Sequence, residues 1–510
     1  MRSFIPGTIL FYLGYQRNRK AIDSEVWHCA LHGASGVVNF IPIADHYSYI
    51  HPTFAPTKLS NWWLEAVGDL SRGMGKTLME RKRENDGIAV LYSHDSVQRL
   101  HFDDFGEKPE GRTRGPKLYK TALDRFQDVL EALPLQYDYV DEKGINAGML
   151  KNFRVLCLPM AIAVGEQTLS TLRTFVEDGG TIISDSGAAL YGRDLKRRSV
   201  DWFSKEVFGV AYAPQEVALS AYKEVKVNGG WADTEFSGQT FATTDGKRAV
   251  ELQGGSAAAA FADGTPALIE KTLGKGRGIF LNFVPAVEEQ TCRLFEGILR
   301  QAGVKFHVKL IGEKGHVKDV ECMRYTNGDA STILALQWKY PSSAPPQRFR
   351  VVLDEAFHVY DMRGGTYLGK INEIPLLELE DGQTVVFALL PYEVDAIEVQ
   401  PKKKDILAGE VAEFEITLKA NGDGALDHVV RIEVKGPDQS LAHYGQGGGT
   451  VMTVGHPTKP LPHYAAVGVM KDGRWTYRLP TALNDAGGEW ELQATDVISG
   501  KKAVVNFQVR

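Results

Sequence analysis

The first 84 residues alternate between apolar runs with the period of strands and apolar runs with the period of helices. Strand-like runs occupy 8–15 and 36–44, and helix-like runs occupy 21–33 and 58–79. Gly33 ends the first helical run as a natural C-terminal cap. Two βα units cannot bury both faces of a parallel sheet, so this segment needs further strands from elsewhere in the chain or from a partner.

A second alternating pattern follows over residues 86–304. Its strand-like runs are 88–93, 136–140, 153–159, 181–187 and 276–284. Its helix-like runs are 117–135, 166–180 and 288–303, and the stretch before the last strand is less regular. Alternating βα units of this kind predict a doubly wound, flavodoxin-like layer structure.

From about Val304 the helical period gives way to short alternating strands. These are 331–338, 348–353, 358–362, 384–390 and 395–399, and they predict a small β-sandwich domain over 305–401. After the charged break PKKKD, the same pattern continues through 402–510 and predicts an immunoglobulin-like β-sandwich. The Cys…Trp…Cys pattern of antibody domains is absent from it.

Charge and composition exclude several classes of function. The 510 residues carry a net charge of −6 with no long block of one sign, whereas a nucleic-acid binder needs a basic patch. Four widely spaced cysteines without a C-x-x-C pair predict neither a disulfide framework nor a zinc knuckle. The apolar run 4–15 is too short to span a bilayer and lacks a signal-peptide cleavage site. We therefore expect no membrane partner and, if Met1 is the natural start, a cytoplasmic protein.

The predicted flavodoxin-like layer lacks the motifs of a cofactor or acyl-transfer site. A flavin or dinucleotide site needs a glycine- or hydroxyl-rich loop after the first strand, but the loop SHDSVQRLHFDD contains no glycine. The string GKGRG at 274–278 precedes a strand and is interpreted as a tight turn. Cys157 lies within a strand and has no G-x-C-x-G elbow, unlike an amidotransferase nucleophile. No cofactor is predicted, and this domain is expected to make contacts.

The strand ends of the opening segment carry the candidates for ligand binding. In a (β/α)₈ barrel the active face is built by loops at the carboxyl ends of the strands. Here those loops offer the aromatic, amide and charged side chains that sugar recognition uses, namely Tyr12, Tyr15, Gln16, Arg17, Asn39, Asp45, His46 and Tyr47. All of these except Gln16 and Tyr47 are predicted carbohydrate-binding residues. The alternative is that they are ordinary loop residues.

The same segment lacks the acids of standard glycoside hydrolysis. Two carboxylates must flank the bond, about 5–5.5 Å apart in retaining enzymes. Asp45 is the one acid well placed on such a loop. Asp23 and Glu25 are expected in the first turn of the helix, where they favour the positive end of its dipole. No catalytic residue and no metal ligand is predicted.

The order of these parts resembles the β-galactosidase-like glycoside hydrolases of family 42. HCALHGASGVVNF, followed by NWWLEAVGDLSRGMGKTLMERKRENDGIAVLYS, looks like the end of their barrel. DVLEALPLQYDYV and FRVLCLPMAIAVGEQTLSTLRTFVEDGGTIISD resemble the family's trimerisation domain, which is flavodoxin- or class I amidotransferase-like and non-catalytic. YDMRGGTYLG with VVFALLPYEV resembles the small β domain, and RWTYRLPTALNDAGGEWELQATDVISGK the terminal sandwich of larger relatives.

The resemblance implies four parts and a homotrimer. Residues 1–84 would be the last two βα units of the barrel, 85–304 the trimerisation domain, and 305–401 and 402–510 the two β-sandwiches. The family's catalytic glutamates follow barrel strands four and seven, but strand four would lie upstream, and residues 1–17 contain no Asp or Glu. Either Met1 is not the true start, or a partner chain supplies the rest of the barrel, or this is a relative without hydrolase activity.

The sequence thus predicts the C-terminal region or a subunit of a β-galactosidase-like glycoside hydrolase that acts on carbohydrate and is inactive as this chain alone. The competing class is a non-catalytic oligomerisation or carbohydrate-binding protein. A third interpretation is a cofactor-binding flavodoxin relative.

Overall fold

The computed structural model describes residues 9–14, 16, 18–39, 57–105, 114–185, 187–212, 222–231, 234–235, 239–244, 250–313, 315–328, 331–342, 345, 347–422, 427–437 and 464–510. They form two compact units, one made of Asn85–Val320 and the other of Ile9–Glu84 together with Glu321–Arg510. The second unit is therefore built from two stretches that are far apart in the sequence. Among the described helices, none combines the length and the apolar character needed to cross a membrane.

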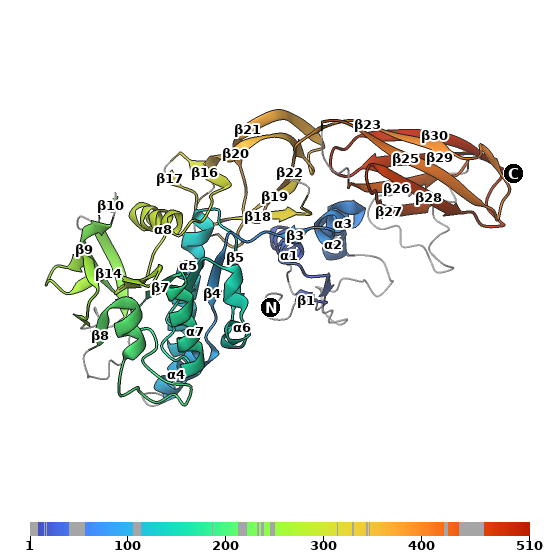
Figure 1. Cartoon of the computed structure of the whole chain (residues 1–510). Helices are drawn as coiled ribbons and strands as arrows, with labels where there is room; N and C mark the ends of the chain where they lie inside the picture. The colour runs from blue at the N-terminus through green and yellow to red at the C-terminus, as the bar shows by residue number, and fades with distance from the viewer. Residues whose placement is uncertain are drawn as a thin grey trace. The chain divides into compact units, whose positions relative to one another are not determined.

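The first unit is an α/β unit in which helices alternate with strands before a run of successive strands (Figure 1). Its elements are β4 (Ile88–Leu91), α4 (His94–Phe105), α5 (Arg114–Ala132), β5 (Tyr137–Val140), α6 (Glu142–Asn146), η2 (Met149–Asn152), β6 (Val155–Leu158), α7 (Glu166–Glu177), β7 (Thr181–Asp185), η3 (Ser204–Phe208), β8 (Val210–Tyr212), β9 (Tyr222–Trp231), β10 (Thr234–Glu235), β11 (Gln239–Thr244), β12 (Val250–Leu252), β13 (Ser256–Phe261), β14 (Pro266–Leu273), β15 (Gly276–Leu281), α8 (Glu289–Gln301), β16 (Val308–Gly312) and β17 (Gly315–His316).

Its main sheet is parallel in one half and antiparallel in the other. The parallel half runs β5, β4, β6, β7, β15, an order that places the first strand along the chain between the second and the third. Beyond β15 the sheet continues antiparallel through β14, β13 and β9. The stretch between β7 and β15 that was irregular in sequence thus supplies the antiparallel half.

Both faces of the parallel strands are buried, as their uninterrupted apolar runs require. Successive residues of a strand point to opposite faces, so Val155 and Cys157 of β6 pack with helices α5 and α8, whereas Leu156 and Leu158 pack with α7. The same alternation holds in β4, β7 and β15. The two hydrophobic layers place α5 and α8 on one face of the sheet and α6 and α7 on the other.

The second unit joins two βα elements to a set of long β-strands. Its elements are β1 (Phe11–Gly14), α1 (Arg19–Leu31), β2 (Gly36–Asn39), α2 (Lys58–Asp69), η1 (Leu70–Met74), α3 (Gly75–Met79), β3 (Lys82–Arg83), β18 (Val320–Thr326), β19 (Thr332–Trp338), β20 (Arg348–Asp361), β21 (Thr366–Glu378), β22 (Thr384–Leu390), β23 (Glu393–Pro401), β24 (Asp405–Ile406), β25 (Val411–Asn421), β26 (Val429–Lys435), β27 (Tyr464–Val469), β28 (Arg474–Pro480), β29 (Gly488–Asp496) and β30 (Lys502–Val509).

The ends of α1 follow from local sequence. The side chain of Asn18 accepts a hydrogen bond from the backbone N–H of Ala21 at 2.9 Å and caps the first turn. At the other end Gly33 has a φ of 79°, the left-handed conformation that stops a helix, which confirms the predicted cap. The predicted helix 58–79 is interrupted instead. Gly73 has a φ of 124° inside the π-turn η1, and a Cβ there would lie 2.5 Å from a methyl of Val497.

The strands after Val320 differ from two of the sequence predictions. β21, β20, β22, β19, β18 and β3 form one continuous sheet, not the two facing sheets of a sandwich. β23 was assigned to this part, but it pairs with β25. The sheets β23–β25–β28 and β24–β30–β29–β26–β27 then share one apolar core, the arrangement of a sandwich, and that sandwich begins at Glu393 instead of at 402. The charged PKKKD segment is therefore a connection inside it.

Candidate functional site

The parallel strands β1 and β2 carry two of the predicted carbohydrate-binding residues. Gly14 lies opposite Asn39 in the register, so the carboxyl ends of the two strands meet. Tyr12 lies inside β1 and not in the loop after it, and Asn39 is the last residue of β2. The other predicted residues lie outside the described part of the chain, namely Tyr15, Arg17, Asp45 and His46. The role of all six in binding stays a prediction.

Glu25 of α1 contacts this edge. Because α1 begins at Arg19, Asp23 and Glu25 lie beyond its first turn, and the predicted helix-dipole role is wrong. The hydroxyl of Tyr12 and the side chain of Gln16 hydrogen-bond Glu25. Burial outweighs both bonds and raises the pKa of the Glu25 carboxyl, and burial together with the bond to Glu25 raises the pKa of Tyr12. This is one half-buried acid, whereas a retaining hydrolase uses a pair.

Two histidines and a buried carboxylate meet on another side of α1. His28 lies in the last turn of α1, His32 follows four residues later at its C-terminal cap, and Glu321 is the second residue of β18. His32 Nε2 lies 3.0 Å from Glu321 Oε1, and His28 Nδ1 lies 3.7 Å from Glu321 Oε2. Burial alone would raise the pKa of Glu321, but the charge and hydrogen bond of His32 lower it. Burial lowers the pKa of His28, and repulsion from His32 adds to this effect.

The sequence predicted no metal ligands, although this group combines donor types that bind divalent cations. One signal was available, the His-x-x-x-His spacing that places both rings on one face of a helix. Glu321 is 289 residues away from His32 and only the fold brings it there.

The segment that was expected to be a loop after β4 forms most of α4, and the hydroxyls at the start of this helix bond within the protein. The hydroxyls of Ser93 and Ser96 both donate to the carbonyl of Ala163, at 2.9 and 3.1 Å. The backbone N–H of Ser93 donates to the Tyr119 hydroxyl at 2.7 Å. In a phosphate-binding loop, such an N–H would point at the anion instead. Together with the missing glycine, these contacts count against a phosphate-binding loop at this strand end.

Cys157 has the environment of an inert thiol. It lies in the middle of β6, paired with Val90 of β4 and Ile183 of β7, and is completely buried. Burial, together with the nearby carboxylate of Asp185, raises the pKa of the thiol. A nucleophilic cysteine needs access and a lowered pKa, so Cys157 acts as a small apolar core residue, in agreement with its predicted place within a strand.

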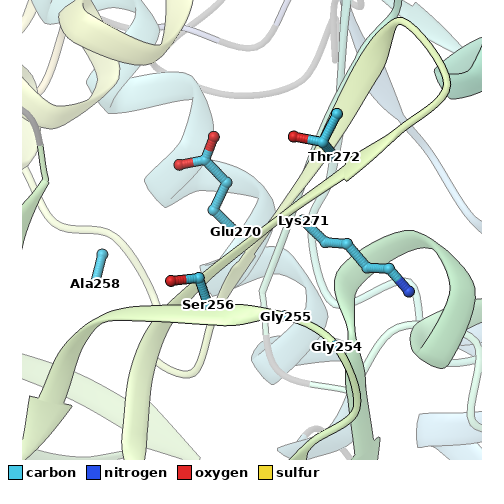
Figure 2. A pocket seen from close by; sticks show the side chains of 7 residues that line it. All are labelled: Gly254, Gly255, Ser256, Ala258, Glu270, Lys271 and Thr272. Carbon is cyan, nitrogen blue, oxygen red and sulfur yellow. The ribbon is translucent and has the colours of Figure 1, made fainter.

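A cavity of about 420 Å³ opens beside the hairpin β13–β14 (Figure 2). It is lined by Gly254, Gly255, Ser256, Ala258, Glu270, Lys271 and Thr272. Figure 2 shows the neighbours Glu270 and Lys271 pointing apart. Glu270 accepts from Trp231 Nε1 at 2.7 Å and pairs with Arg277 at 3.1 Å, while Lys271 donates to the carbonyl of Lys205 at 2.8 Å. Both charged groups of the cavity are thus engaged with the protein.

A serine, a histidine and an aspartate meet in the terminal sandwich, but not as a hydrolase triad. His428 Nδ1 lies 2.8 Å from Asp496 Oδ1, and His428 Nε2 lies 3.0 Å from the Tyr392 hydroxyl. The backbone N–H and the hydroxyl of Ser499 both donate to Asp496 Oδ2. Ser499 therefore bonds the aspartate and not the histidine, and all four residues are buried. The group is a structural hydrogen-bond network.

Comparison with known families identifies one segment directly. Residues 87–305 match the β-galactosidase trimerisation domain. No curated protein matches the sequence.

Solved structures of family 42 β-galactosidases share the fold. A catalytic mutant of Gan42B from G. stearothermophilus is 15% identical, with a TM-score of 0.57 over 73% of this chain and 51% of its own. The enzyme from Bacillus circulans sp. alkalophilus is 15% identical, with a TM-score of 0.57 over 73% of this chain and 52% of its own. The enzyme from Rahnella sp. R3 is 14% identical, with a TM-score of 0.56 over 73% and 51%. The chain thus spans about half the length of these enzymes.

These likenesses agree with a multidomain α/β plus all-β fold. They also place the matched segment inside the first unit of the structure. Residues 87–305 of this chain thus match the model of the β-galactosidase trimerisation domain, and the chain shares its fold with solved family 42 β-galactosidases.

Proposed function

We propose that this chain is the C-terminal region or a subunit of a β-galactosidase-like glycoside hydrolase, and that its flavodoxin-like segment 85–304 assembles it into a homotrimer. The observation that carries the proposal is the match of residues 87–305 to the trimerisation domain. The inert Cys157 and the internally satisfied loop after β4 support a role in assembly over a role in chemistry.

We further propose that the opening segment 1–84 supplies the last two βα units of a barrel. β1 and β2 are parallel and α1 connects them, which is the repeating unit of that fold. β1 also exposes large apolar side chains, with 65% of Phe11 and 42% of Leu13 accessible. An exposed apolar strand is a template for pairing, so further barrel strands, from the same polypeptide or from a partner chain, are its expected neighbours.

The oligomeric state tests the assembly role. The purified chain should sediment with three times its 56.3 kDa mass, and the value should hold on dilution through the micromolar range. Sedimentation equilibrium or light scattering after size exclusion measures it directly. A stable monomer or dimer at all concentrations would contradict the homotrimer.

Catalysis tests the other part of the proposal. Because the described barrel edge offers one acid, Glu25, where two are needed, the pure chain should show no turnover of a nitrophenyl β-galactoside above background. The experiment compares the wild-type chain with Asp45→Ala and Glu25→Gln. Turnover by the wild type that is lost in either variant would overturn the prediction that this chain alone is inactive, and it would leave the proposed homotrimer unaffected.

A further inference from the structure

We propose that His28, His32 and Glu321 form a binding site for a divalent transition-metal ion, with Zn²⁺ as the expected occupant. This site lies within the second unit and is independent of the assembly role of the first. One ligand atom from each residue can be chosen so that the three lie within 4.8 Å of one another. Among the described residues, this is the group of at least three His, Cys, Asp or Glu side chains whose ligand atoms are close enough to share one ion.

The spacing of these atoms suits a small ion. With metal–ligand bonds of about 2.0–2.1 Å, tetrahedral geometry separates two ligand atoms by roughly 3.3–3.4 Å. Glu321 Oε1 lies 3.0 Å from His32 Nε2, and Glu321 Oε2 lies 3.7 Å from His28 Nδ1. One distance is slightly shorter and the other slightly longer than the tetrahedral ligand–ligand separation. The two rings are also close, with centroids 4.2 Å apart. Small side-chain rotations are enough to centre an ion between the three groups.

The donor set selects the metal class. Two imidazoles with one carboxylate are ligands of Zn²⁺ and its first-row neighbours, whereas Ca²⁺ and Mg²⁺ favour oxygen ligands. Helical i, i+4 spacing holds the imidazoles on one face, and the strand supplies the third ligand from outside the helix. The side chain of Arg83 places positive charge near Glu321, which weakens the site and therefore argues for moderate affinity.

The surroundings orient the ligands and leave a path for the ion. The Glu321 side chain is only 9% exposed, so its carboxylate has a fixed direction. Gln337 hydrogen-bonds the ring of His28 and is itself fixed by donating to the carbonyl of Ser24 at 2.8 Å. In contrast, 56% of the His28 side chain is exposed, so solvent reaches the site and can supply a fourth ligand.

A bound ion would act as a clamp. It would connect α1 in the first stretch of the second unit to β18 in the second stretch, across 289 residues of sequence. An ion that binds the folded state and not the separated segments stabilises the folded state. The site therefore predicts metal-dependent stability of this unit.

The experiment uses the full-length chain without an affinity tag, stripped with EDTA and compared with His28→Gln, His32→Gln and His316→Gln. His316 is the matched control, because it makes a similar His–Glu contact with Glu289, at 2.7 Å, in the other unit. Zn²⁺ binding is measured by calorimetry and by competition with a chromogenic chelator. Thermal unfolding with and without Zn²⁺ and the visible absorption of bound Co²⁺ provide two further readouts.

The wild type and His316→Gln should bind one equivalent at the site, gain thermal stability with Zn²⁺ and show tetrahedral Co²⁺ bands. His28→Gln and His32→Gln should keep the fold by circular dichroism and lose the ion at least about 10-fold more readily. If the wild type binds no Zn²⁺, or if all four proteins bind it equally, the proposal is overturned and the group is a hydrogen-bonded cluster only.

Discussion

Replacing Asp496 by alanine should lower the free energy of unfolding of the second unit by about 3–5 kcal/mol. The carboxylate of Asp496, the last residue of β29, is fully buried. It bonds His428, which directly precedes β26, and Ser499 in the turn after β29. His428 in turn reaches the Tyr392 hydroxyl, just before β23 of the other sheet. Removing the aspartate leaves these donors buried without their acceptor, which costs more than the original pair contributed.

The same carboxylate predicts how this stability depends on pH. Burial by itself would raise the pKa of Asp496, but the charge of His428 and hydrogen bonds from His428 and Ser499 outweigh it and lower the pKa. A lowered folded-state pKa contributes stability that is fully present above the unfolded value of about 3.9 and is lost as the pH falls through the folded-state value. The difference in stability between wild type and Asp496→Asn should therefore shrink below about pH 4.

Urea denaturation at several pH values measures both effects. The control is Asp405→Ala, which removes a carboxylate from an exposed pair with Arg510 and should cost only about 0–1 kcal/mol. Equal losses for the two alanine variants, or a difference between wild type and Asp496→Asn that grows at low pH, would contradict the assigned role of Asp496.

Replacing Trp27 by alanine should cost a similar amount, about 3–5 kcal/mol. The indole is completely buried in a core that includes Met323 and Tyr325 of β18. Its face is covered by the guanidinium of Arg363, 4.8 Å from the ring centroid, and Arg363 is held by Asp69 of α2 at 2.9 Å. The truncation would remove a large apolar volume and one side of this cation–π contact.

This substitution asks whether the opening βα elements are a stable part of the second unit. Trp27→Phe should recover part of the loss, and Leu64→Ala is the control, because Leu64 of α2 is 46% exposed and should change stability by less than about 0.5 kcal/mol. Thermal and urea unfolding measure the three variants. Wild-type stability in Trp27→Ala would mean that α1 does not contribute to this core.

The sequence predicts local elements well wherever one period dominates. The run around Cys157 is apolar on both faces, which is the pattern of a central parallel strand, and it forms β6. The stop at Gly33 is also visible, because only the left-handed backbone of a C-terminal cap favours glycine there. The burial of the Cys157 thiol also follows from the apolar residues around it.

What the sequence does not show is which distant segments meet. The two predicted strands 348–353 and 358–362 are one strand, β20, whose register shifts between Val352 and Phe357 and so breaks the alternation. β21 was missed because its burial alternates poorly. Strand pairing also decides that β23 belongs to the sandwich. The contact of Glu321 with His28 and His32 also depends on the pairing of distant segments, so it cannot be predicted from the sequence.

The discontinuity of the second unit has a consequence for biosynthesis. α1 is complete at Leu31, but its buried partners in β18 begin only at Val320, after the whole first unit has been made. At roughly 5–20 residues per second, the ribosome needs about 15–60 s to add the intervening residues. During that time α2 can already cover Ile22 and Val26, but the side of α1 that carries Trp27 and Leu31 lacks β18, while Asn85–Val320 can fold as it emerges. The opening segment is therefore where we expect chaperones to bind during translation.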